Sequence, residues 1–163
     1  MTPPVVVEPL PLILTNASVI LDGTELACVA NHVELSPDIN ITTLDTFCGS
    51  RDYPGTVKWS LILTLYQSFD VDATEDVLSR CVAGGVPVPF TIAGYRDVAA
   101  GTATNPSWSG DVIPQPYAPI NGDAGDASTV ELEWSVVGEP LKTPEPVARE
   151  SATATAAKAK APA

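Results

Sequence analysis

The chain has 163 residues, 45% of them apolar, and it carries 20 acidic against 8 basic side chains, a net charge of −12. This length fits one ordinary domain with its own core. The charge excludes tight binding to nucleic acid, which needs clustered basic groups to neutralise phosphates. The acidity belongs to the body, because the chain has 4 basic and 18 acidic residues up to Leu141, but 4 and 2 after it.

The cysteines and the N-terminus indicate the compartment. Cys28, Cys48 and Cys81 are odd in number and widely spaced, which favours free thiols over a zinc site or a disulfide framework. The N-terminus has no basic residues, and prolines interrupt its apolar run, so we expect no signal peptide and no membrane anchoring by this chain. The sequence therefore predicts synthesis in a cytoplasm.

The N-terminal third predicts short strands and one loop. Residues 1–16, rich in Pro and aliphatic side chains, predict an N-terminal arm. Strands are expected at 17–22 and 25–36, around the Asp22-Gly23 turn, and at 39–44. Thr46 to Gly55 has no periodicity and contains Gly, Asp and Pro, which predicts a long loop near 46–55. Long loops in compact domains are often functional.

The strongest strand signal lies at 56–69. Alternate apolar residues define one face there: Val57, Trp59, Leu61, Leu63 and Leu65. The other face also carries apolar groups, so this strand is expected at the centre of a sheet or against another chain.

One helix is predicted, at about 72–83. Asp72 is the expected N-cap, and Glu75 lies three residues later, as in a capping box. Gly84-Gly85 ends the apolar stripe, as glycines after a helix do. A single helix cannot make a fold, so we expect it to cover a sheet.

The C-terminal part predicts three more strands and a tail. Strands are expected at 88–95, 107–113 and 128–137, with a turn at 118–127. In the last strand Val130, Leu132, Trp134 and Val136 alternate with Thr129, Glu131, Glu133 and Ser135. After Gly138 large apolar groups almost vanish, which predicts a flexible tail. The expected organisation is an arm at 1–16, a β domain at 17–138 and a Pro/Ala/Lys-rich tail at 139–163.

No pattern predicts an enzyme, a cofactor or a metal site. The single histidine, His32, has no catalytic motif around it, and no nucleotide-binding motif occurs. Asp70 to Glu75 resembles the start of a calcium loop but lacks the glycine at its sixth position. The Asn121–Asp126 turn offers oxygen ligands, although its Gly and Asp residues equally suit a plain turn. Metal binding at that turn stays open.

Two further clusters have plain structural interpretations. Glu131 and Glu133 would lie about 7 Å apart on one strand face, and a solvated face explains them better than a glycosidase pair. Trp59, Trp108 and Trp134 could form a ligand platform, but apolar strand faces favour core positions.

Several stretches, taken in order, resemble the tail tube (major tail) proteins of long-tailed, non-contractile bacteriophages. The resemblance covers Ala17 to Gly138 and rests on the succession of VKWSLILTLYQSF, DATEDVLSRCVAGG, VPVPFTIAGY, NPSWSGDVIPQP and GDASTVELEWSVVG. It implies a β-sandwich or barrel-like tail tube fold with one flanking helix.

The resemblance also implies a structural role in a virion. Such subunits form hexameric rings that stack into a tube, and the genome crosses it on ejection. The implied partners are copies of the chain itself, the tape measure protein, tail tip or terminator proteins, and double-stranded DNA in transient, non-specific passage. The implied ring-stacking loop holds Cys48, Gly49, Ser50, Arg51, Asp52 and Tyr53. An acidic channel would repel DNA phosphates, and its candidate lining residues are Thr129, Glu131 and Glu133.

The alternative prediction is a monomeric β-sandwich module for adhesion or carbohydrate binding. Its ligand rim would consist of Trp108, Tyr117 and the Asn121–Asp126 turn.

Overall fold

The computed structural model describes residue 14 and residues 16–144. It contains eight strands and one helix in this part of the chain: β1 (Ser18–Leu21), β2 (Thr24–Glu25), β3 (Ala30–Thr46), β4 (Gly49–Tyr66), α1 (Thr74–Gly84), β5 (Val88–Ala93), β6 (Ser107–Ile113), β7 (Thr129–Val136) and β8 (Leu141–Thr143). The strands form one antiparallel sheet in the order β2-β1-β5-β6-β7-β4-β3, and β8 pairs with β6. The predicted mainly β fold with one helix is confirmed.

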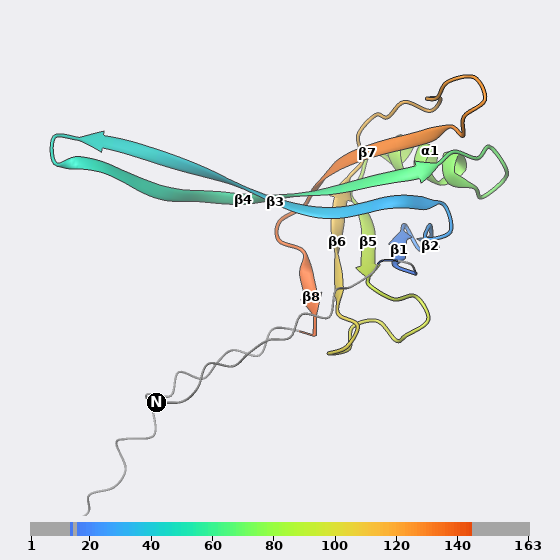
Figure 1. The fold of residues 1–163 in the computed structure, drawn as a ribbon, viewed down its shortest axis with the longest axis horizontal. Helices are drawn as coiled ribbons and strands as arrows, with labels where there is room; N and C mark the ends of the chain where they lie inside the picture. The colour runs from blue at the N-terminus through green and yellow to red at the C-terminus, as the bar shows by residue number, and fades with distance from the viewer. Residues whose placement is uncertain (1–13, 15, 145–163) are drawn as a thin grey trace, which may run out of the picture.

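The sheet folds on itself into two layers. In Figure 1, β7, β4 and β3 run across the picture, whereas β1, β5, β6 and β8 run up and down and cross them. The layers join at one corner, where β6 pairs with β7 through only two residue pairs, Val112 with Val136 and Ile113 with Ser135. This is the geometry of an orthogonal β-sandwich.

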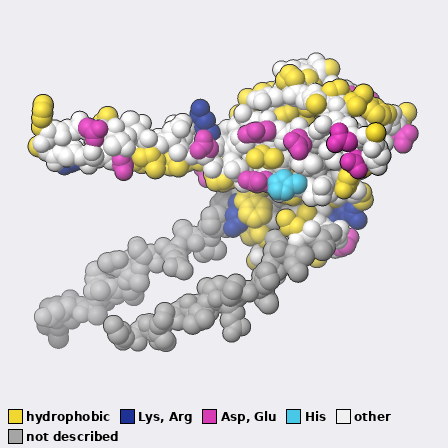
Figure 2. Space-filling model, turned by 45° about the horizontal axis from the view of Figure 1, so that its top comes forward, with side chains coloured by type: hydrophobic (Ala, Val, Ile, Leu, Met, Phe, Trp, Pro, Cys, Tyr) yellow, Lys and Arg dark blue, Asp and Glu magenta, His cyan; other side chains and the backbone are white. Residues whose placement is uncertain are grey.

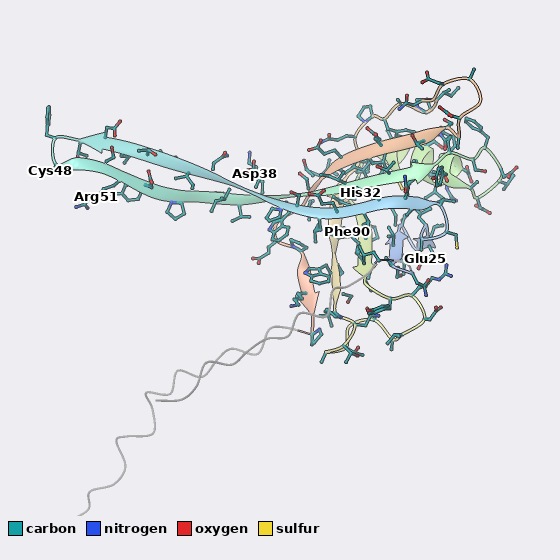
Figure 3. All side chains as sticks on the ribbon, viewed as in Figure 1. Glu25, His32, Asp38, Cys48, Arg51 and Phe90 are labelled. Carbon is teal, nitrogen blue, oxygen red and sulfur yellow. The ribbon has the colours of Figure 1, made fainter. Side chains whose placement is uncertain are left out.

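The core lies between the two layers and under α1. Every second residue of β4 points into the core there: Leu61, Leu63 and Leu65. Their pairing partners on β7 point the same way: Trp134, Leu132 and Val130. Phe90 of β5, labelled in Figure 3, enters from the crossing layer. The helix adds buried side chains of its own, Val77, Leu78 and Cys81. Burial raises the pKa of the Cys81 thiol.

The strand β8 lies inside the segment that we expected to be tail. β7 pairs only with the last two residues of β6, Val112 and Ile113. The first residues of the same edge, Ser107–Ser109, therefore pair with β8. The ordered sheet therefore continues past Gly138. The rest of the predicted tail, 145–163, and most of the predicted arm lie outside the described residues.

The helix starts without the predicted cap. Ala73 occupies the N-cap position and has no side-chain cap, while Asp72 adopts a positive φ of 58°. The first turn is held by the preceding loop instead: Thr74 Oγ1 donates to the Tyr66 carbonyl at 2.9 Å, and Glu75 N–H donates to the Ser68 carbonyl. The predicted end is confirmed, because Gly85 ends the helix in the left-handed region.

The predicted long loop near 46–55 is wrong. β3 and β4 continue through it as one ladder, from Ile41–Pro54 to Thr46–Gly49, and only Phe47 and Cys48 form the turn. The prediction failed because Gly and Pro interrupt the apolar alternation at a β-bulge, which is a feature of strands as well as loops. The separate strand expected at 39–44 is part of β3.

Gly55 lies at this bulge, and its backbone passes very close to β3. A Cβ on Gly55 would lie 2.4 Å from the carbonyl oxygen of Asn40, closer than atoms can approach. We therefore expect Gly55→Ala to shift the ladder beyond the bulge while the body stays folded. Amide hydrogen exchange should speed up for residues 40–56 only. Gly84→Ala is the control, because the new Cβ would meet only an ordinary contact, at 3.9 Å from Val86 Cγ2, and the backbone of Gly84 has no positive φ.

Candidate assembly surfaces

No constellation of catalytic side chains forms in the described residues. His32 is exposed, and its Nε2 atom lies 3.4 Å from a carboxylate oxygen of Glu34. Residues 14 and 16–144 contain no group of three or more His, Cys, Asp or Glu side chains placed to hold a metal ion. No helix in this part of the chain is long and apolar enough to cross a membrane. Three surfaces of the molecule stand out instead.

The first surface is the distal hairpin, residues 37–58, which leaves the body as a narrow arm (Figure 1). Every residue from 37 to 58 is exposed. β7 pairs with β4 only over Ser60–Tyr66, so within the described residues this part of β4 pairs only with β3. At roughly 3.3 Å per residue, the ladder beyond Asp38 is about 25–30 Å long.

Side chains and backbone fix the hairpin tip internally. Thr43 Oγ1 donates to Asp52 Oδ1 at 2.6 Å, and the Ser50 hydroxyl donates to the Asp45 carboxylate. Thr46 Oγ1 donates to the Gly49 carbonyl at 2.8 Å. The tip therefore holds its shape without a partner, which favours a preformed binding element over one that folds on binding.

The hairpin carries apolar groups that the described residues leave exposed. Phe47 at the turn is 112% exposed, and five other large side chains along the ladder are between 44% and 62% exposed: Ile39, Ile41, Leu44, Tyr53 and Val57. Long exposed strands with unpaired edges aggregate unless something pairs with them. This arm is therefore an expected contact surface.

The predicted stacking-loop residues lie together at this tip. Cys48 belongs to the two-residue turn, and Gly49 to Tyr53 form the first residues of β4. Figure 3 places Cys48 and Arg51 at the far end of the arm and Asp38 near its base. The sequence analysis placed 46–55 in a loop and 39–44 in a separate strand, whereas the structure joins the two in one hairpin.

The second surface is the outer face of β3, β4 and β7, which is acidic. Glu131 and Glu133 are exposed there, while Thr129 is half-buried. Ile62 of β4 lies between Glu133 of β7 and Glu34 of β3. In the same way, Thr64 lies between Glu131 and His32. Figure 2 shows acidic side chains gathered around the histidine on this side of the body. The predicted alternation of β7 is confirmed, since its inward residues are buried.

The third surface is an apolar groove at the end where the two layers diverge. It is a cavity of about 390 Å³ lined by Leu14, Val33, Leu35, Trp59, Ile92 and Trp108, with smaller residues between them. Most of these continue the inward-facing rows of β3, β4, β5 and β6 beyond the filled core. We call this cavity the mouth groove. An adjoining cavity of about 470 Å³ shares Leu14, Ala17 and Val33 with it.

Two cations border these cavities. The Lys142 ammonium lies 5.6 Å from the centroid of the Trp108 ring, a cation–π distance. Arg96 lines the adjoining cavity and donates to Cys28 Sγ at 2.9 Å. The predicted core position of Trp134 is confirmed at 1% exposure, but Trp59 and Trp108 are half-buried groove residues.

The ligand rim of the alternative prediction does not form. Trp108 lies at the start of β6, beside β8, whereas the 121–126 turn follows the opposite end of that strand (Figure 1). Tyr117 packs against the core, and burial, with Glu75 beside it, raises its pKa to about 12. Trp134 Nε1–H donates to the Gln115 carbonyl at 3.1 Å, which fastens the segment to the body.

Solved structures with this architecture come from injection machinery. A chain of the extended-state sheath-tube complex of the PVC extracellular contractile injection system aligns with a TM-score of 0.58 and 13% identity, over 82% of this chain and 92% of that chain. A chain of the extended-state PVC sheath/tube terminator aligns with a TM-score of 0.58 and 14% identity, over 85% and 99%.

The chain has a tail tube-like fold. No protein-family model and no curated protein sequence matches it. The structural likeness is to a contractile system, so the resemblance to the tubes of non-contractile phages is not decided by it. At 13–14% identity the likeness establishes the fold alone.

Proposed function

We propose that this chain is a structural virion protein, the subunit of a phage tail tube. Copies assemble into hexameric rings, the rings stack, and the stack encloses an acidic channel for the genome. The observation that carries the proposal is the distal hairpin on a tail tube-like fold: 22 exposed residues, apolar at the tip, in a ladder that buries none of its residues within the described part of the chain. Such an arm is a hazard in a monomer and an interface in a repeating assembly.

The sheet edges favour the same role. β3 pairs only with β4 along all of Ala30–Thr46, so its other edge is free within the described chain. Ring closure turns such an edge into a contact between neighbours. The tape measure, tail tip and terminator proteins, as proposed partners, would meet the inside and the two ends of the stack.

Self-assembly is the direct test of this role. Purified full-length protein should form rings or hollow tubes in negative-stain images as its concentration rises, and sedimentation velocity should show large species growing from the 17.0 kDa monomer. A chain that stays monomeric at millimolar concentration, with or without purified tail tip complex as a nucleus, contradicts the proposal. A monomer that also binds glycans on an array would favour the adhesion module.

The acidic face is proposed as the channel lining, with Thr129, Glu131 and Glu133 pointing inward. Carboxylates near DNA phosphates repel them over about one Debye length, roughly 8–10 Å at physiological salt, so a duplex would pass without adhering. Glu34 of β3 and Glu133 of β7 lie on either side of Ile62 on this face, so the negative charge extends over the strands on both sides of β4.

Charge reversal tests the channel. Tubes of Glu131→Lys/Glu133→Lys protein should retain double-stranded DNA at 50 mM salt and release it at high salt, whereas wild-type tubes should retain none. Asp123→Lys/Asp126→Lys makes the same change of charge on the exposed 121–126 turn and is the matched control. Equal retention of DNA by the two variants would contradict the proposal that the exposed face of β7 lines the channel.

A further inference from the structure

The mouth groove and the hairpin tip are complementary surfaces at opposite ends of the same arm. The groove lies where β3 and β4 leave the body, and Phe47 belongs to the turn that joins their far ends. Its neighbour in that turn, Cys48, is labelled in Figure 3. We propose that the hairpin tip of one copy inserts Phe47 into the mouth groove of the next copy. This inference rests on the proposed function and names the receptor for the hairpin.

The groove has room for an occupant from outside the filled core. Its walls are Leu35 and Trp59 from one layer and Ile92 and Trp108 from the other, all half-buried. They point inward like the core residues of the same strands, but the layers diverge there and leave about 390 Å³ between them. A pocket of this size takes an aromatic ring with neighbouring side chains. Phe47, 112% exposed on a two-residue turn, is the least covered apolar group among the described residues.

The charges of the two surfaces also match. The tip carries two acids, Asp45 and Asp52, each held by a hydroxyl of the opposite strand, and one base, Arg51, so its net charge is −1. The described chain has only five basic residues, and two of them, Arg96 and Lys142, border the groove or the adjoining cavity. The acidic groups of the tip would be attracted to the cations at the edge of the groove, and this attraction would orient Phe47 toward the groove.

The contact is heterologous, because the tip and the groove are different surfaces. A heterologous contact that does not close on itself propagates as a filament, with one copy for each arm length. The inference therefore accounts for growth along a tube axis, at a repeat set by the roughly 25–30 Å of ladder beyond Asp38. The chain's own N-terminal segment is the competing occupant, since Leu14 also lines the groove.

Thiol cross-linking tests the contact at its two ends. Cys48 supplies a native thiol at the tip, and Cys81 is buried, so only Cys28 has to be removed. In a Cys28→Ser background, Ala17→Cys places the second thiol in the groove wall. A short bis-maleimide added to assembled protein should give dimers, trimers and higher species on a denaturing gel. Cys48→Ser should abolish them, and Ala124→Cys, on the exposed 121–126 turn, should give none.

The outcomes separate this contact from the proposed function. Wild-type protein that forms no assembly contradicts the function and the contact together. Protein that assembles normally but gives no cross-linked series through Ala17→Cys contradicts the contact alone, which is also the outcome if the N-terminal segment fills the groove. A series that stops at dimers indicates a symmetric pair and likewise overturns the proposal.

A second measurement does not depend on added cysteines. Phe47→Ala should raise the protein concentration needed for assembly by roughly tenfold to a hundredfold, because a buried phenylalanine is lost from every contact. Val71→Ala removes a comparably exposed apolar side chain, 90% exposed near α1, and should leave that concentration unchanged. Equal effects of the two substitutions overturn the proposal.

Discussion

A chain with a shortened β3–β4 hairpin should fold normally and fail to assemble. Replacing residues 40–56 by Asn-Gly joins Ile39 and Val57, which face each other in the ladder, through a two-residue turn. The removed residues are all exposed, so the free energy of unfolding should change by no more than about 1 kcal/mol. Assembly should become undetectable at concentrations a hundredfold above those that suffice for the wild type.

Circular dichroism and sedimentation velocity measure the two halves of this prediction. A variant with Asp45→Asn and Asp52→Asn keeps the hairpin length and removes two charges, so it separates loss of the arm from loss of charge. Tubes of normal length from the shortened chain would contradict the proposed role of the hairpin. A shortened chain that does not fold would show instead that the arm supports the body, which the exposure of residues 37–58 argues against.

Trp134→Ala should be the most destabilising of the tryptophan substitutions. Trp134 is 1% exposed at the centre of the core, and its indole N–H donates to the Gln115 carbonyl. Truncation leaves a cavity and an unpaired carbonyl, at a cost of about 3–5 kcal/mol. Because domains of this size have about 5–15 kcal/mol in total, a large part of the stability would be lost.

Urea unfolding followed by far-ultraviolet circular dichroism gives the comparison. Trp59→Ala is the matched control, since Trp59 lies on the same inward row of strand faces but is half-buried in the mouth groove. It should cost about 1–2 kcal/mol in the monomer. Equal losses for the two variants would contradict the distinction between core and groove.

The alternation of apolar and polar residues predicted the strands of the body correctly, because every second residue of a half-buried strand faces the core. The inward rows of β4 and β7, with Trp134 among them, follow the sequence pattern directly, as does the end of α1 at Gly85. Where neither face of a strand is buried, no alternation of apolar and polar residues is needed, and the sequence pattern does not predict the strand. Residues 46–55 face solvent on both sides, so their sequence carries no period, and the loop predicted there is wrong.

Other features depend on contacts distant in sequence and were not predictable locally. The N-cap prediction at Asp72 failed because Tyr66 and Ser68 satisfy the first turn of α1 from the preceding loop. β8 contains few apolar residues, and it pairs only because β7 leaves part of the β6 edge free. The mouth groove arises from the angle between two layers, which no single strand encodes.

The measurement that tests the account most directly is a cryo-electron microscopy reconstruction of the particles formed by the full-length chain. We expect stacked hexameric rings around an open bore, with Glu131 and Glu133 on the bore wall and each distal hairpin reaching a subunit of the adjacent ring. Particles without a bore, or a bore lined by the basic side chains Arg96 and Lys142 with the hairpins free in solvent, would contradict it.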